Sequence, residues 1–77
     1  MKLYIVTDAL NETRCINQYK PKVFTNYDDA FNSMETDYNS IVNNNLDVQE
    51  NWLGNIGAHI TYKNGQVEYY DLWEVEV

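Results

Sequence analysis

Apolar residues in the middle of the chain recur at the spacing of one face of an α-helix. Counted from Tyr27, they fall at offsets of 0, 3, 4, 7, 11, 14 and 15, the period of an amphipathic helix. Thr25 or Asn26 is a suitable N-cap, and two aspartates follow in the first turn, where the helix dipole favours anions. Three asparagines at 43–45 end the pattern, because asparagine side chains compete for backbone hydrogen bonds. The pattern predicts one helix that begins at Tyr27 and ends at Val42.

A hairpin is predicted where Asn64-Gly65 separates two strand-like segments, Ala58 to Lys63 and Gln66 to Val77. Asn-Gly is the preferred dipeptide of a type I′ turn. In the second segment one parity is apolar, and if that parity faces the core, the other faces solvent. Asp71 interrupts the alternation, which is typical of a bulge or bend. The apolar parity comprises Val67, Tyr69, Trp73, Val75 and Val77, and the other parity comprises Glu68, Tyr70, Leu72, Glu74 and Glu76.

The remaining segments are less regular. Residues 1–7 are predicted to form a strand, either central or covered on both faces, because Leu3 to Val6 form a continuous apolar run. Residues 8–22 are polar and contain Pro21, so we expect a loop there, with room for a short strand at 14–17. Residues 46–57, which include Trp52, are expected to pack over the core as a lid. The chain is therefore predicted to be one acidic α+β domain, residues 1–77, with a three- or four-stranded, mainly antiparallel sheet and one amphipathic helix on one face.

Charge is distributed unevenly along the chain. Ten of the twelve carboxylates lie between Val23 and Val77, together with a single cation, Lys63, and the formal net charge is −7. A small domain cannot bury so many unpaired charges, so most of them face water and give the surface a negative field. This field disfavours direct binding of nucleic acid and of anionic membrane surfaces.

Candidate residues for catalysis or metal binding are few. Cys15 and His59 are the only residues of their types, so neither a nucleophile–base pair nor a zinc site can be assembled from the sequence. The helical acids do not have the spacing of a calcium loop. We expect no catalytic residue, no metal and no cofactor. The chain opens with neither a leader nor an apolar span, which favours a cytoplasmic protein.

The acidic residues form the better functional signal. On the final strand Glu74 and Glu76 share a face about 6.6–6.8 Å apart by strand rise, and such a row imitates a nucleic-acid backbone. Tyr70 on the same parity would anchor a partner while the charges steer it. Two alternatives remain open: the acids serve only solubility, and Tyr70 packs beneath the Trp52 segment. The candidate partner-binding residues are Asp28, Asp29, Glu35, Asp37, Tyr70, Glu74 and Glu76.

Three segments resemble small orphan proteins of phages and prophages. These are the opening strand 1–6, the aromatic turn into the helix at 23–30, and the closing strand 69–77. Among such proteins, small acidic domains recur as inhibitors of host defence, including anti-CRISPR and anti-restriction proteins, some of which imitate DNA. The resemblance implies a binding role and assigns no individual residue.

The leading expectation is a non-enzymatic inhibitor or adaptor. Its acidic surface would occupy the basic surface of a protein partner such as a nucleic-acid-processing enzyme. A structural or regulatory homodimer formed through the long C-terminal strand is the alternative. A small hydrolase or metal-dependent enzyme is the least favoured.

Overall fold

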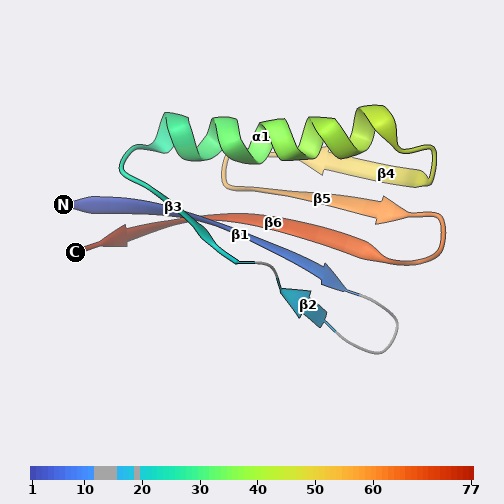
Figure 1. The fold of residues 1–77 in the computed structure, drawn as a ribbon, viewed down its shortest axis with the longest axis horizontal. Coiled ribbons are helices and arrows are strands. Elements are labelled where there is room, and N and C mark those ends of the chain that lie inside the picture. The colour runs from blue at the N-terminus through green and yellow to red at the C-terminus, as the bar shows by residue number, and fades with distance from the viewer. Residues whose placement is uncertain (12–15, 19) are drawn as a thin grey trace.

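The computed structural model describes residues 1–11, 16–18 and 20–77, and Figure 1 shows their arrangement as one sheet with one helix across it. The elements in chain order are β1 (Lys2–Asn11), β2 (Ile16–Gln18), β3 (Lys22–Phe24), α1 (Tyr27–Asn44), β4 (Val48–Leu53), β5 (Gly57–Tyr62) and β6 (Val67–Glu76). The α+β class and the single helix on one face of the sheet agree with the sequence prediction.

All strand pairs of the described residues are antiparallel, in the order β2-β1-β6-β5-β4. The sheet is five positions wide because β2 and β3 pair with successive parts of the same edge of β1. The longest ladder joins β1 and β6, from Lys2↔Glu76 to Asn11↔Val67. The two ends of the chain therefore lie side by side, and the backbones of Met1 and Val77 exchange hydrogen bonds.

Helix α1 forms where the apolar period predicts it. Asn26 is the N-cap: its side chain accepts the Asp29 backbone N–H at 2.8 Å and donates to the Asp29 carboxylate at 2.9 Å. At the other end Asn44 donates to the Ser40 carbonyl at 2.9 Å. The asparagine run therefore stops the helix by the competition for backbone groups expected of this residue type.

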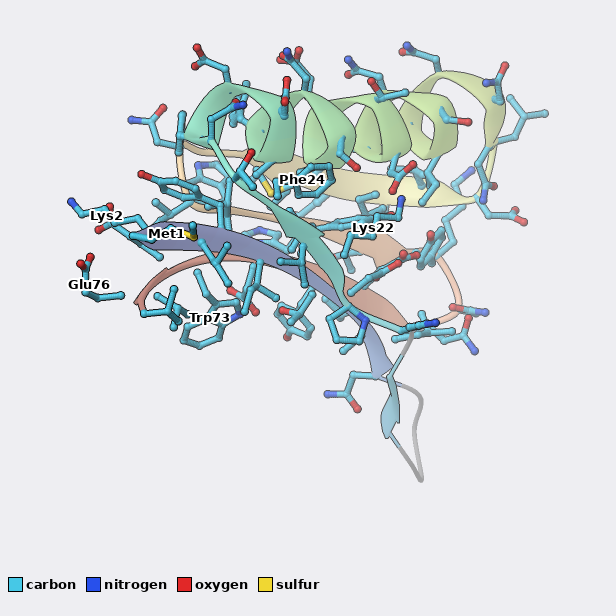
Figure 2. All side chains as sticks on the ribbon, turned by 60° about the vertical axis from the view of Figure 1, so that its left-hand side comes forward. Met1, Lys2, Lys22, Phe24, Trp73 and Glu76 are labelled. Atoms are coloured by element: carbon cyan, nitrogen blue, oxygen red, sulfur yellow. The ribbon has the colours of Figure 1, made fainter. Side chains whose placement is uncertain are left out.

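The core lies between α1 and one face of the sheet. The helix residues Ala30, Met34 and Tyr38 face the sheet, and Met34 is fully buried together with Ile60 of β5. The sheet side of the core consists of Val6, Ala58, Ile60, Tyr70 and Leu72. Phe24 adds a partly buried ring from β3, and Figure 2 shows it between the sheet and the helix.

The β5–β6 hairpin is confirmed, but its turn is not type I′. A type I′ turn needs two residues with positive φ, whereas among the described residues only Gly65 has one, at 90°. Gly65 donates to the Tyr62 carbonyl at 3.0 Å, and Tyr62 donates to the Gln66 carbonyl at 2.8 Å. This is a three-residue loop, in which a turn over Lys63 and Asn64 is followed by a glycine bulge.

The predicted strand count is too low. The segment expected as a lid contains β4, which pairs with β5 from Val48↔Tyr62 to Leu53↔Ala58. The first strand does not stop at residue 8, because the long partner β6 continues the ladder to Asn11 despite the polar sequence. Within the predicted loop, β2 and β3 add to the edge of β1. Arg14 and Cys15, the first half of the short strand expected at 14–17, lie outside the described residues.

Candidate binding surface

The faces of β6 are reversed relative to the expected burial of its apolar parity. Tyr70 is 3% exposed and Leu72 is also buried, while Tyr69 and Trp73 are exposed. The cause is the pairing with β5: Tyr70 lies opposite Ala58, and directly opposed residues share a face. Ala58 and Ile60, which share one face of β5, lie under the helix, so Tyr70 lies there too. Tyr70 is therefore not a surface anchor, and Glu68 is also buried.

The other face of the sheet has no helix over it among the described residues. Exposed apolar side chains lie on three of its strands, with exposed fractions of 54% for Trp73 on β6, 52% for Trp52 on β4 and 59% for Val23 on β3. Figure 2 shows Trp73 on the side of the sheet away from the helix. The strand registers place these residues on this surface, here called the open face: Leu3, Ile5, Thr7, Ala9, Val23, Glu50, Trp52, His59, Thr61, Val67, Tyr69, Asp71, Trp73 and Val75.

Both indole rings of the open face are held in place by neighbours. The Trp52 ring stacks on His59 with centroids 5.4 Å apart and folds over Gly54, where a Cβ atom would lie only 2.4 Å from the ring. The Trp73 ring donates from Nε1 to Thr7 Oγ1 at 3.0 Å. The aromatic groups are thus exposed and oriented at once.

The predicted acids of the helix lie on the opposite side of the sheet from the open face. Asp28 and Asp29 are exposed in the first turn, and Glu35 is half-buried. Asp37 accepts a hydrogen bond from Lys22 of β3 at 2.9 Å. One flat partner surface cannot touch these helical acids and the open face together.

The two strand acids lie at the end of the molecule where the chain termini meet. Glu74 lies 3.3 Å from the Lys2 ammonium group and accepts a hydrogen bond from the Tyr4 hydroxyl at 3.2 Å. Glu76 lies 3.4 Å from the N-terminal ammonium group. Lys2 and Lys22, early cations in the sequence, therefore cover part of the acidic field.

A carboxyl pair that was not predicted, half-buried Asp8 and buried Glu68, lies on the helix side of the sheet. Asp8 lies across the β1–β6 ladder from Tyr70, and Glu68 accepts a hydrogen bond from the Tyr62 hydroxyl at 2.9 Å. Burial, then the hydrogen bond and charge of Glu68, raise the pKa of Asp8 to about 8. Burial also raises the pKa of Tyr70. No local pattern in the sequence indicates this pair, because Asp8 and Glu68 become neighbours only through the register of β1 and β6.

A hollow lies at the same end of the molecule as Glu74. It has a volume of about 420 Å³ and is lined by Tyr4, Tyr27, Ile56, Leu72, Trp73 and Glu74. The Tyr4 and Tyr27 rings meet edge to face at 6.1 Å, and the Tyr27 hydroxyl donates to the Asn55 carbonyl at 2.5 Å. The hollow is therefore bounded by rings from β1 and α1 and by the β4–β5 connection.

Comparisons with protein-family models, curated proteins and solved structures give no match for this chain. Among the described residues, no helix has the length and apolar character needed to cross a bilayer. In the same part of the chain, no three acidic, histidine or cysteine side chains cluster as metal ligands would.

Proposed function

We propose that this protein is a non-enzymatic inhibitor or adaptor that binds a basic surface of a protein partner. The observation that carries the proposal is the open face, on which both tryptophans and Tyr69 are exposed on a folded sheet. Large contiguous apolar patches on soluble proteins mark interaction sites. Tryptophan and tyrosine are also the residues that most often supply the binding energy of protein interfaces.

The orientation of the indole rings supports tight rather than incidental contact. Trp52 is held between His59 and the backbone at Gly54, and Trp73 is tied to Thr7. A side chain that is already ordered loses less conformational entropy when a partner covers it. The open face is therefore prepared for docking in the free protein.

The chemistry of the open face favours a protein partner over nucleic acid. Proteins that bind single-stranded nucleic acid combine stacking aromatics with cations that follow the phosphates. The described residues of the open face include no lysine or arginine. They include two acidic residues, Glu50 and Asp71. The phosphates of a nucleic acid would therefore meet two carboxylates and no cation on the described part of the open face.

The acids supply the preference for a basic partner. Asp28 and Asp29 lie in exposed positions with no cation within ion-pair distance among the described residues. In our proposal these helical acids act by attracting and orienting the partner rather than by contact, since the open face lies on the other side of the sheet. Basic surfaces suited to this role occur on nucleic-acid-processing enzymes, and a phage-encoded inhibitor of host defence fits the proposal.

Affinity capture from the organism that encodes the chain, with three baits, tests the proposal. The baits are the wild type, an open-face variant (Tyr69→Ser with Trp73→Ser) and a control, Leu46→Ser, which removes an exposed apolar side chain from the loop before β4. We expect a basic protein to be retained by the wild type and the control, lost by the open-face variant and released by salt. A neutral or acidic partner, or equal capture by the open-face variant, would refute the proposal.

A further inference from the structure

The last third of β6 has an unpaired edge. Strand β5 accompanies β6 only as far as the pair Gly57↔Asp71, while β1 accompanies it to Glu76. Beyond Asp71, the bond from Leu72 N–H to the Ile56 carbonyl, at 2.8 Å, is the last backbone hydrogen bond on that side among the described residues. The segment 73–76 is therefore an edge strand on its outer side.

The pairing identifies the free backbone groups. Met1 and Val77 exchange both of their backbone bonds, so the odd residues of β6 turn their backbone groups toward β1 and the even residues turn theirs outward. The Leu72 bond to Ile56 points the same way. Among the described residues, the N–H and C=O of Glu74 and the N–H of Glu76 have no partner.

The hollow lies directly beside this edge. Leu72 and Glu74, two even residues of β6, line it together with Tyr4 and Tyr27 on the helix side. A strand added to the edge would place alternate side chains on that side, one opposite Glu74 and the next over the hollow. Glu74 is exposed and acidic, and the hollow is mostly aromatic and aliphatic.

We propose that this edge binds an extended segment of the partner by β-strand addition. The segment has a lysine or arginine opposite Glu74 and an apolar side chain two residues away, over the hollow. Main-chain bonds to Glu74 and Glu76 supply affinity, and the alternate side chains supply specificity. The inference rests on the proposed function, because it specifies how a basic protein partner would extend its contact from the open face around the sheet edge.

Self-pairing of this edge between two copies is disfavoured by charge. The Leu72 N–H is already occupied, so a two-fold antiparallel pair must use Glu74 and Glu76. Every such register opposes Glu74 to Glu74, Glu74 to Glu76, or Glu76 to Glu76. Like charges directly opposite destabilise a strand pair, and the exposed cations beside them, Lys2 at Glu74 and the N-terminal ammonium group at Glu76, offset this only weakly because water screens exposed ion pairs. A basic segment of another protein therefore fits the edge better than a second copy does.

A synthetic peptide tests the edge without a known partner. The probe is acetyl-Thr-Leu-Thr-Arg-Thr-Leu-Thr-amide, which puts arginine and leucine on one face of a strand. Its binding is measured by nuclear magnetic resonance of the isotope-labelled protein. We expect the Glu74 and Glu76 amide signals to shift and their hydrogen exchange to slow by about tenfold or more at saturation. The amides of Trp73 and Val75, which already bond β1, should keep their exchange rates.

Three controls separate strand addition from general attraction. N-methylation of the peptide arginine removes a main-chain donor and should abolish binding, and replacing this arginine by glutamate should weaken it by about tenfold or more. The variant Glu74→Lys should prefer the glutamate peptide, while Glu50→Lys, with the same charge change on the open face, should keep the arginine preference. Unshifted Glu74 and Glu76 amides at millimolar peptide, or equal binding of the N-methylated peptide, would overturn the inference.

The outcomes distinguish this inference from the proposed function. If a basic partner is captured through the open face but binds Glu74→Lys as tightly as the wild type, the edge inference fails and the function stands. If the peptide adds to the edge but no basic partner is captured, the edge stands and the proposed function fails.

Discussion

Tyr69 and Tyr70 are neighbours in the chain, yet they lie on opposite sides of the sheet. Tyr70 is 3% exposed beneath α1, and Tyr69 is 44% exposed on the open face. The pair shows that β6 has two different faces: Glu68, Tyr70 and Leu72 complete the core, and the odd residues lie on the open face. The two tyrosines also provide a matched pair of substitutions.

Replacing the two tyrosines separately should have unequal effects on stability. Tyr70→Ala should lower the free energy of unfolding by about 3–5 kcal/mol, because it leaves a cavity between α1 and β6, and Tyr69→Ala by less than about 1 kcal/mol. Urea denaturation followed by circular dichroism measures both. If Tyr70→Ala fails to fold, Tyr70→Leu should still cost more than Tyr69→Leu. A larger loss at Tyr69 would show that the assigned faces are wrong.

The tryptophan fluorescence of the free protein should report the open face. The chain has only two tryptophans, and both are about half-exposed on that face. We expect the native protein to emit at long wavelength, with acrylamide quenching closer to that of the urea-unfolded chain than to that of a buried indole. Blue-shifted emission that resists acrylamide in the monomer would contradict the exposure of Trp52 and Trp73.

Stability should fall as the pH rises from about 5 to 8. The pKa of Asp8 is raised to about 8 in the folded protein, against about 4 in the unfolded chain, so the folded state binds more protons in this window. The contribution of Asp8 to stability is therefore complete below pH 4 and is lost as the pH approaches 8.

Asp8→Asn isolates this effect. The variant should be more stable than the wild type at pH 8 by about 1–2 kcal/mol, a figure reduced for solvent screening of a partly exposed group, and the difference should shrink toward pH 5. Urea midpoints at several pH values measure it. The account of the carboxyl pair fails if the variant and wild type show the same pH dependence.

A hydrogen bond between α1 and β4 should contribute measurably to the fold. The Tyr38 side chain is buried, and its hydroxyl donates to Asn51 Oδ1 at 2.5 Å. Tyr38→Phe should cost about 1 kcal/mol in unfolding free energy, since it removes the donor and keeps the ring. Tyr27→Phe is a control near the helix start, because its hydroxyl donates to the exposed Asn55 carbonyl. If Tyr38→Phe has the same free energy of unfolding as the wild type, the hydrogen bond to Asn51 does not stabilise the fold.

Local patterns sufficed to predict the helix and the hairpin. The period of α1 and its Asn26 cap lie within one segment, and the glycine of the β5–β6 loop specifies a tight turn. The type I′ turn expected at Asn64-Gly65 was wrong, because asparagine tolerates both the positive φ of that turn and the negative φ that Asn64 adopts here.

The open face could not be predicted from β6 alone. Its apolar parity would normally be buried, but the side on which a strand faces a helix depends on its neighbours, here Ala58 and Ile60 of β5. The same holds for Asp8 and Glu68, which are 60 residues apart in the chain and meet only through the β1–β6 register. The position of the candidate site therefore depends on pairing between strands that are distant in the sequence, and no local pattern reveals it.

Site-specific photocrosslinking tests the role of the open face most directly. A photoreactive phenylalanine analogue is incorporated in place of Trp73, or in place of Asn39 on the exposed side of α1 as the control, and the cells that encode the chain are irradiated. The account predicts a covalent adduct between position 73 and a basic protein, with no such adduct from position 39. Adducts with that protein from position 39 alone would place the contact on the helix and contradict the account.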